Sequence, residues 1–380
     1  MDFELSEEQL VLREAVRDFL VRRWDADHMR RALDDPPALI PTELWKEMAA
    51  LGWIGIAVSD DVGGGGSDVL TASVLAEESG RGLLPATLSS VLAAAIAIDR
   101  GGGAQRTSVL PALCAGDHRV ICAIEEPGGA WGPDAVRSEA ETVADGWVLS
   151  GTKILVPDSE ELEQLLVAAR TPAGLGLVEV PVETPGITVT PMRRLDAQSI
   201  AEVVLDGVVV PASALIGGPE RADATLRAVY DIWTVLSAAD LLGVAEAALD
   251  LTTAYATERR QFGRPIGSFQ AVSHRLADLL VDVEISRSLV YAACLALDED
   301  RENAPALVSA AKSFAGDTAV AAAEGAVQLH GGIGFTWELD VHLYLRRALA
   351  GAASLGDSDF HRDRIARVLD RYDTGQDDQP

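Results

Sequence analysis

The sequence predicts an α+β protein that is mainly helical, with a helical N-terminal domain, a middle β domain and a C-terminal four-helix bundle. Apolar residues recur at helical spacing through residues 1–117 and again through 218–372, where long alanine-rich stretches are joined by short loops. Between them, residues 118–217 carry short β-branched runs separated by turn residues. The last segment, 373–380, is polar and is expected to be a disordered tail.

The N-terminal domain is expected to open with a helix after Ser6. Ser6 and Gln9 are spaced to form a capping box, in which each side chain bonds the backbone N–H of the other residue. More helices are expected from Pro41 onward. The apolar positions that define the first helix are Leu12, Val16, Phe19 and Leu20.

A glycine-rich stretch, "GWIGIAVSDDVGGGGSD", separates two of these helical segments. It lacks the preceding strand and the lysine of a P-loop, so the glycine run alone is poor support for phosphate binding. We interpret it as a flexible turn.

The middle and C-terminal domains differ in the period of their apolar residues. Runs such as "VICAIEEP", "LLVAAR" and "AEVVLDGVVVP" are strand-like. After Gly218 the period becomes helical and stays so through "LRAVYDIWTVLSAADLLGVAEAALDLTTAYATERRQFG" and the stretches that follow. These long amphipathic segments predict the bundle.

Charge and composition exclude several function classes. The chain has 59 acidic and 31 basic residues, a formal net charge of -28, which argues against binding nucleic acid or an anionic membrane surface through a basic face. The N-terminus "MDFELSEEQL" lacks the pattern of a signal peptide, and no apolar run is expected to span a bilayer. We predict a cytoplasmic protein without membrane or nucleic acid partners.

Three cysteines, Cys114, Cys122 and Cys294, form no CxxC pair and lie in apolar sequence. They are expected to be buried small apolar residues in a reducing compartment. No residue set has metal-ligand spacing, so no metal site is predicted.

Two motifs in the bundle carry groups suited to a nucleotide. In "ERRQFG", Arg259 is a forked cation at the end of a long helix, which suits bidentate contact with a pyrophosphate; the alternative is a solvated surface arginine. In "QLHGGIGF", the glycines can expose backbone amides, or can simply cap the helix. His330, inside this motif, is expected to be structural.

The order of the domains, together with "ERRQFGRPIGSFQ", "QLHGGIGF" and "VADGWVLSGTK", resembles the acyl-CoA dehydrogenase family over essentially the whole chain. The resemblance implies an FAD-dependent α,β-dehydrogenation of an acyl-CoA. In that family a glutamate removes the α proton, the β hydride goes to the flavin, and electrons usually leave to an electron-transfer flavoprotein. It also implies FAD contacts that reach across a dimer interface to the neighbour's flavin, from Arg259, Gln261, Phe262, Ile266, Gln328, Gly331, Gly332 and Gly334.

The segments that the family places at the chain's own flavin ring are altered. Glu125, in "IEEPGGAWGPD", stands where relatives carry a threonine, and the serine that meets the CoA arm falls within the altered "AWGPD". In "GTKILVPDSEE", Leu155 and Pro157 replace the usual tryptophan and hydroxyl residue. Proline has no backbone N–H to donate.

Both expected positions of the catalytic base are also altered. Counting 21 residues beyond Gly334, as in many relatives, leads to Leu355, and the alternative position on the first bundle helix falls on Trp233, followed by Thr234. Neither Leu355 nor Trp233 can take a proton, and loss of a positioned base typically costs ~100- to 10,000-fold in rate. Asp357 is a candidate replacement on a loop, although a solvated turn aspartate is the commoner role. Asp231 would point about 200° around the helix from residue 233.

These departures lead to three hypotheses. In the first, the chain is the non-catalytic subunit of an α2β2 acyl-CoA dehydrogenase that shares FAD with a catalytic paralogue, and the resemblance implies bulky substrates, including CoA esters of steroid side chains. In the second, it is a self-sufficient homotetramer with Asp357 as base. In the third, it is a flavin-free interaction protein that kept the bundle only to assemble.

Overall fold

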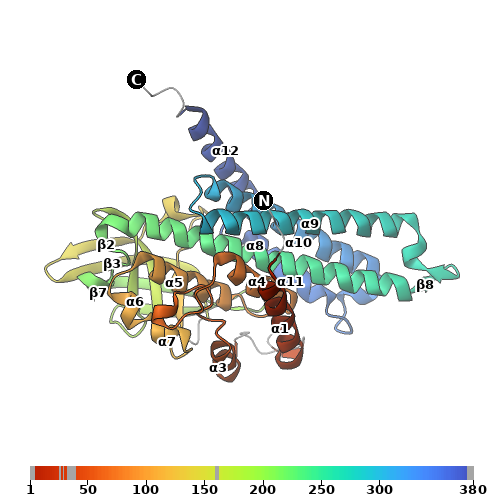
Figure 1. Ribbon diagram of the computed structural model, residues 1–380, viewed down its shortest axis with the longest axis horizontal. Coiled ribbons are helices and arrows are strands. Elements are labelled where there is room, and N and C mark those ends of the chain that lie inside the picture. The colour runs from red at the N-terminus through yellow and green to blue at the C-terminus, as the bar shows by residue number, and fades with distance from the viewer. Residues whose placement is uncertain (1–4, 25–26, 29, 32–39, 159–161, 375–380) are drawn as a thin grey trace. The chain divides into compact units, whose positions relative to one another are not determined.

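A computed structural model describes residues 5–24, 27–28, 30–31, 40–158 and 162–374 (Figure 1). In chain order, helices run as far as Cys114, strands occupy the interval from Val120 to Pro211, and helices return from Gly218. This order confirms the predicted α+β fold, with helical domains on either side of a β domain in the sequence. Of the predicted tail, residues 373 and 374 end the last helix and 375–380 lie outside the described residues. The domain limits at residues 117 and 217 stay predictions.

The chain divides into two compact units, and each unit combines segments that are not consecutive in the sequence. One, here called the bundle unit, contains Met1–Arg30, Ser73–Leu84 and Thr234–Pro380, and the other, the sheet unit, contains Arg31–Ala72 and Pro85–Trp233. The N-terminal helices are therefore divided between the two. Their bounds are α1 Glu7–Arg23, α3 Thr42–Ala50, α4 Val69–Arg81, α5 Thr87–Gly101, α6 Ala104–Ser108 and α7 Leu110–Cys114.

Helix α1 begins as the sequence predicts. The backbone N–H of Gln9 donates to Ser6 Oγ at 3.2 Å, and the Ser6 N–H donates to Gln9 Oε1 at 2.9 Å. This reciprocal pair satisfies two of the free donors at the helix start and confirms the capping box. Val16 and Leu20 are the buried residues of the helix, one turn apart.

The sheet unit is built on a seven-stranded mixed sheet in the order β1-β4-β2-β3-β7-β6, with β5 paired to β4. β1 and β4 are parallel, and β3 and β7 form the longest antiparallel pair. Helix α5 packs on β1, whose four residues are all buried, and the Cys122 N–H donates to Ser90 Oγ on that helix. The strands are β1 Val120–Ala123, β2 Glu139–Val143, β3 Gly146–Pro157, β4 Gln164–Thr171, β5 Gly174–Pro181, β6 Ile187–Arg193 and β7 Ser199–Pro211.

The glycine-rich stretch of the sheet unit is a compact, hydrogen-bonded loop. The backbone N–H groups of Gly64, Gly65 and Gly66 donate to carbonyl oxygens of residues 55–59 at 2.8 to 3.0 Å. A Cβ at Gly64 would lie 2.1 Å from the carbonyl oxygen of Val58. Glycine is required here by close backbone approach, so the interpretation as a flexible turn was wrong.

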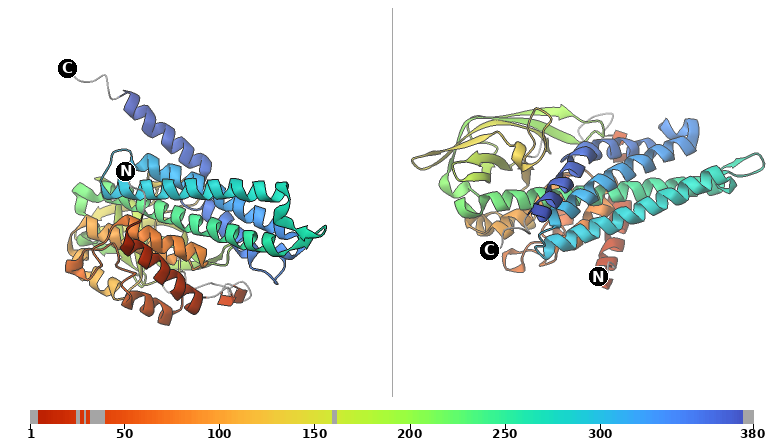
Figure 2. Two further views of the ribbon diagram at one scale, coloured as in Figure 1. Left: turned by 45° about the vertical axis from the view of Figure 1, so that its right-hand side comes forward. Right: turned by 90° about the horizontal axis from the view of Figure 1, so that it is seen from above.

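The bundle unit consists of long helices lying side by side, as both views in Figure 2 and Figure 1 show for α8, α9 and α10. Arg347 on α11, only 1% exposed, donates to both carboxylate oxygens of Asp240 on α8. Gly80 on α4 and Gly243 on α8 let these two helices cross closely, because a Cβ at either would lie within 2 Å of a carbonyl oxygen of the other helix. Helix α8 Gly218–Glu258 enters this unit at Thr234, and the helices that follow it are α9 Gln270–Asp298, α10 Ala304–His330, α11 Val341–Ala353 and α12 Ser358–Thr374.

Helix α8 corrects the expectation that no apolar run could span a bilayer. It contains a stretch long and apolar enough to cross a membrane by length and composition, and 89% of that stretch is buried inside the structure. A core helix passes the same test, so this is weak evidence for a span. The three cysteines are free and buried, as predicted.

Candidate functional site

The "ERRQFG" motif forms a short hairpin at the end of α8. Its two-residue strands, β8 Arg260–Gln261 and β9 Arg264–Pro265, pair with each other around Phe262 and Gly263. Both turn residues have positive φ, +52° and +80°, which is the pattern of the tight turns that match strand twist. The turn leaves Phe262 90% exposed.

Arg259 lies at the base of this hairpin with its side chain open. Its backbone oxygen accepts from the Ile266 N–H at 2.8 Å, which fixes the two ends of the hairpin to each other. The Arg259 side chain is exposed and has no hydrogen bond or ion pair with the residues that the structure describes. Gln261 is likewise exposed and Ile266 is half-buried. The guanidinium is therefore available to an anion.

The glycines of "QLHGGIGF" have different roles. Gly331, at φ +66°, caps α10 through its N–H, which confirms the capping alternative for that residue. A Cβ at Gly334 would lie 2.7 Å from the oxygen of Val327, so this glycine is required by packing. Added Cβ atoms at Gly331 and Gly332 would meet nothing within 4 Å. The backbone there faces open space, and Gln328 beside it is exposed.

His330 brings the two motifs together. Its ring stacks on Tyr255 of α8 with centroids 4.2 Å apart, and its Nδ1 lies 2.7 Å from the carbonyl oxygen of Ala326. Tyr255 precedes Arg259 by one helical turn, and its carbonyl accepts from the Arg259 N–H. The residue is structural, as expected, and it joins the end of α8 to the end of α10.

These features fit the phosphate and adenosine parts of FAD. They combine a forked cation that has no partner among the described residues, an exposed amide side chain and an open backbone at two glycines, all at one end of the bundle unit. Pyrophosphate favours forked guanidinium donors and backbone N–H groups that it can approach closely.

The sheet unit brings together the two segments that the resemblance assigns to the flavin ring. The Ile154 N–H on β3 donates to the carbonyl oxygen of Glu125 at 2.9 Å. Leu155 sits in a register irregularity of β3 at φ +55°, and Pro157 is buried opposite Ile200 of β7. The Glu125 side chain is 6% exposed. A buried carboxyl group and a proline without an N–H fit an electron-rich ring poorly.

A buried ion pair, which we did not predict from the sequence, joins the residues next to Glu125 and Ile154. Lys153 on β3 is fully buried, and its Nζ lies 2.6 Å from Glu126 Oε1. Burial lowers the pKa of Lys153 to about 8, against the opposing effect of Glu126. Glu126 also accepts from the backbone N–H groups of Arg137 and Ser138. The chain has three lysines, and nothing in the sequence distinguishes the buried Lys153 from Lys46, whose side chain is largely exposed.

Leu355, one expected base position, is 3% exposed in the turn between α11 and α12, with φ at +56°. Lys312 on α10, itself 1% exposed, donates to the carbonyl oxygen of Gly356 at 3.2 Å. His361, fully buried, places Nε2 3.1 Å from the carbonyl oxygen of Leu355. Trp233, the other expected position, is 8% exposed within α8.

The two aspartates near the expected base positions differ in exposure and in hydrogen bonding. Asp357 is exposed, and its Oδ1 accepts from the Phe360 N–H at 2.9 Å, which is the geometry of a helix cap on α12. Asp231 is 4% exposed. Within the described ranges no three His, Cys, Asp or Glu side chains are grouped as a metal site would require.

The fold and these features define the class of flavin-dependent oxidoreductases that act on acyl-CoA thioesters. Residues 6–117 match the family model for the acyl-CoA dehydrogenase N-terminal domain and residues 234–369 that for the C-terminal domain. A probable acyl-CoA dehydrogenase of Bacillus subtilis, YngJ, is 31% identical over 382 residues, which cover 97% of this chain and 100% of that protein. The chain belongs to the acyl-CoA dehydrogenase family.

Solved structures agree with this assignment. A variant of the Tcur3481-Tcur3483 steroid ACAD is 33% identical with a TM-score of 0.88, covering 97% of this chain and 99% of that chain. One chain of the ChsE4-ChsE5 complex from Mycobacterium tuberculosis is 28% identical with a TM-score of 0.90, covering 100% of this chain and 100% of that chain. Structures of PigA with FAD also match, so FAD is the cofactor that the family relationship supports.

Proposed function

We propose that this chain is the non-catalytic subunit of a heteromeric acyl-CoA dehydrogenase of α2β2 composition. It completes the FAD site of a catalytic paralogue and does not itself remove the α proton. The observation that carries the proposal is Leu355, an aliphatic side chain that is 3% exposed at the position where the family resemblance expects the base.

The setting of Leu355 supports the loss of proton abstraction. Aliphatic side chains have no group that can accept a proton, and Trp233 at the alternative position is equally unsuitable. Asp357, which a self-sufficient enzyme would need, is engaged as the cap of α12.

The contrast between the residues expected at the neighbour's FAD and those expected at the chain's own flavin ring supports an FAD site shared between two subunits. Arg259, Gln328 and Gly332 keep an open, polar arrangement at one end of the bundle unit. Glu125 and Pro157 in the sheet unit carry the wrong groups for a flavin ring. The first set would hold the phosphate and adenosine parts of the neighbour's FAD, together with Gln261, Phe262, Ile266, Gly331 and Gly334. FAD bound there supplies the acceptor for the substrate hydride.

The relatives suggest the partner and the substrate class. One chain of the ChsE4-ChsE5 complex matches over its whole length, and a matching variant comes from a steroid ACAD. We therefore propose a paralogous catalytic subunit as partner and CoA esters of bulky or steroid side chains as substrates. Electrons would leave to an electron-transfer flavoprotein. We place the assembly in the cytoplasm, because free buried cysteines suit a reducing compartment.

The deciding experiment measures the flavin spectrum and native mass of the chain expressed alone, and then co-expressed with an acyl-CoA dehydrogenase paralogue encoded beside it. We expect a colourless protein alone and a yellow mixed tetramer with half as many FAD molecules as chains. A yellow homotetramer that its acyl-CoA bleaches would contradict the proposal and would favour Asp357 as base.

Arg259 provides a second test in the mixed assembly. Arg259→Lys keeps the charge but removes the planar fork, so we expect roughly 10-fold weaker retention of FAD, since hydrogen bonds to charged groups contribute about 1.5 to 3 kcal/mol. Arg260→Lys, in the same hairpin, is the matched control and should retain FAD normally. FAD content on gel filtration is the readout, and equal loss in both variants would contradict a specific role for Arg259.

A further inference from the structure

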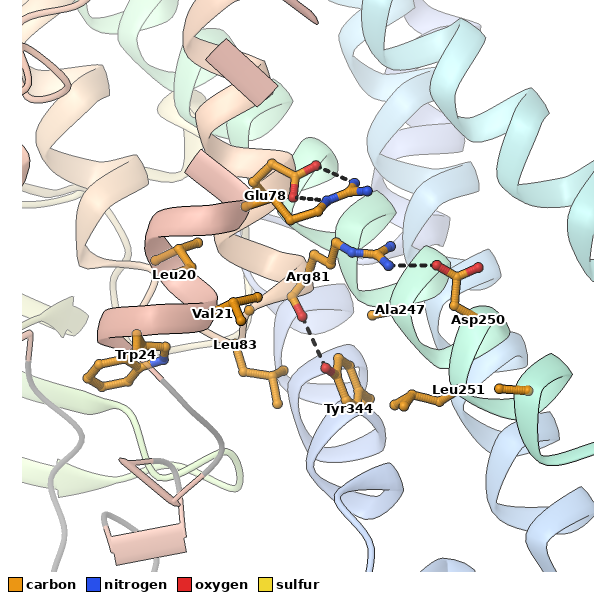
Figure 3. A pocket seen from close by; sticks show the side chains of 13 residues that line it. Leu20, Val21, Trp24, Glu78, Arg81, Leu83, Ala247, Asp250, Leu251 and Tyr344 are labelled. Carbon is orange, nitrogen blue, oxygen red and sulfur yellow. Dashed lines mark hydrogen bonds and ion pairs between the residues drawn. The ribbon is translucent and has the colours of Figure 1, made fainter. Parts of the chain in front are cut away.

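The end of helix α8 that leads to Arg259 extends beyond the contact that anchors the middle of the helix. Figure 3 shows that contact beside a pocket of the bundle unit, where Arg81 of α4 donates to Asp250 of α8 at 2.6 Å. In the stretch 253–258, Ala256 is buried, Tyr255 is half-buried and the other residues are exposed. Because the ends of helices fray, Arg259 keeps a fixed position only if a further contact holds this end of α8.

The ring of Tyr255 makes that further contact, with the end of α10. It stacks on the ring of His330 with centroids 4.2 Å apart and 26° between the ring planes. His330 is 7% exposed, so the stack lies on the inner side of α10. Aromatic rings in contact attract each other by more than the area that they bury implies. The stack therefore joins the two helix ends.

The His330 ring is held in place by its own helix and by the turn that follows. Its Nδ1 lies 2.7 Å from the carbonyl oxygen of Ala326, and because a carbonyl oxygen can only accept, Nδ1 is the donor. A Cβ at Gly334 would lie 3.0 Å from His330 Cβ, so the turn after α10 packs closely on the same residue. His330 thus presents a fixed ring to Tyr255.

Each partner of the stack is next to residues that the proposed function assigns to FAD. On α8, the Tyr255 carbonyl oxygen accepts from the Arg259 N–H at 2.8 Å. On α10, Gly331 directly follows His330 and caps the helix. Gln328 lies two residues before His330, which turns it about 200° around the helix, and it is exposed. Burial of His330 therefore directs Gln328 outward.

We propose that His330 is a positioning residue for the shared FAD site. Through its stack on Tyr255 it sets the separation of the two helix ends, so that Arg259 on one and Gln328 on the other reach the same cofactor. Groups that bind one ligand together must be held within about 0.5 Å of their places. The inference rests on the proposed function, because it takes Arg259 and Gln328 as FAD contacts. His330 acts through Tyr255 and needs no contact of its own with FAD.

The first test uses the full-length chain expressed alone and involves no FAD. Hydrogen–deuterium exchange is followed in the peptides that contain residues 255–262 of α8 and 326–334 of α10. His330→Asn keeps a donor for the Ala326 carbonyl oxygen but removes the ring. It should speed exchange in the α8 peptide about 3- to 10-fold, although the substitution lies on α10, because loss of an aromatic contact favours local opening. His330→Phe keeps a ring and should restore the parent rate.

Exchange in the α8 peptide that is the same in His330→Asn and the parent would overturn the proposal. If His330→Asn does not fold, Tyr255→Leu gives the reciprocal test, with the substitution on α8 and the 326–334 peptide as the readout. Faster exchange there supports the proposal, and an unchanged rate overturns it. His118→Asn is the matched control, because His118 is an exposed histidine of the sheet unit. Its exchange in both peptides should equal that of the parent.

The second test measures FAD retention on gel filtration of the mixed assembly. His330→Asn should retain FAD about 3- to 10-fold less well than the parent, whereas His330→Phe and His118→Asn should retain it normally. Combining His330→Asn with Arg259→Lys should cost less than the product of the two single losses, because a displaced Arg259 has less contact to lose. Losses that multiply would mean that His330 does not act through Arg259.

The outcomes separate this inference from the proposed function. A mixed assembly that forms normally and retains FAD equally in His330→Asn and the parent would overturn the positioning role and leave the proposed function standing. A yellow homotetramer of the chain alone would contradict the proposed function. The same retention measurement on that homotetramer would then decide the role of His330, with weaker retention in His330→Asn and rescue by His330→Phe as the supporting result.

Discussion

The buried ammonium of Lys312 donates a 3.2 Å hydrogen bond to the carbonyl oxygen of Gly356, the residue that follows Leu355. It also donates to the carbonyl oxygens of Gly351 and Ala352, each at 3.1 Å. One side chain from α10 thus donates to carbonyl groups at the end of α11 and in the turn after it. The last carbonyl groups of a helix have no intrahelical partner and need such a donor. This contact holds the turn in which Leu355 adopts a left-handed conformation.

Lys312→Met should therefore destabilise the fold. It keeps the apolar stem but leaves buried carbonyl oxygens without a donor, and we expect a loss of about 2 to 4 kcal/mol in the free energy of unfolding. Denaturant unfolding followed by circular dichroism measures this loss. Lys46→Met, which removes a lysine paired with Asp117 at the surface, is the matched control and should leave stability unchanged. Equal stability of the two variants would contradict the role of Lys312.

His361 should make stability depend on pH. Burial, and after it the nearby charge of Lys312, lowers the pKa of His361 from 6.5 to about 3. As pH falls below 6.5 the unfolded chain takes up a proton that the folded chain does not, so stability is present above pH 6.5 and is lost toward pH 3, by about 1.4 kcal/mol per pH unit.

His361→Gln removes the ionisation and keeps an amide donor for the carbonyl of Leu355. The free energy of unfolding of this variant should fall less steeply between pH 6 and pH 4.5 than that of the parent, by roughly 1 kcal/mol per pH unit. Urea unfolding at several pH values gives both slopes. Parallel slopes would mean that His361 is protonated in the folded protein.

Removing only one partner of the ion pair between Lys153 and Glu126 should destabilise the fold more than removing both charges together. Lys153→Met leaves a mostly buried carboxylate without its cation, and we expect a cost of about 3 to 5 kcal/mol. The double variant with Glu126→Gln should cost less than the sum of the single variants, with a coupling of about 1 to 3 kcal/mol. Additive losses in the double-mutant cycle would show that the two side chains do not depend on each other.

The glycines of "QLHGGIGF" allow packing to be separated from binding. Gly334→Ala should destabilise by about 1 to 3 kcal/mol, because the added methyl group would lie 2.7 Å from the carbonyl oxygen of Val327. Gly332→Ala meets no atom within 4 Å and should leave thermal stability unchanged or slightly raised. In the mixed assembly it should nevertheless lower FAD retention. If Gly332→Ala were destabilised while Gly334→Ala were not, the conclusion that the backbone at Gly332 faces open space would be contradicted.

Local patterns predicted several features correctly. The capping box of Ser6 and Gln9 joins residues three apart, and the burial of the three cysteines follows from their apolar surroundings. The glycine run after Val62 was misinterpreted, because its requirement for glycine comes from the carbonyl oxygens of residues 55–59 folded back against it.

By itself, the sequence determined the order of helical and β regions and the identity of the side chains at the expected base positions, Leu355 and Trp233. Whatever the packing, neither can accept a proton. Only the tertiary structure decided that Lys312 holds the turn of Leu355 and that Lys153 pairs with Glu126, since these partners are 44 and 27 residues apart. The physical reason is that a buried charge must find its hydrogen-bond partners in three dimensions, and a one-dimensional pattern does not specify which distant groups packing brings within reach.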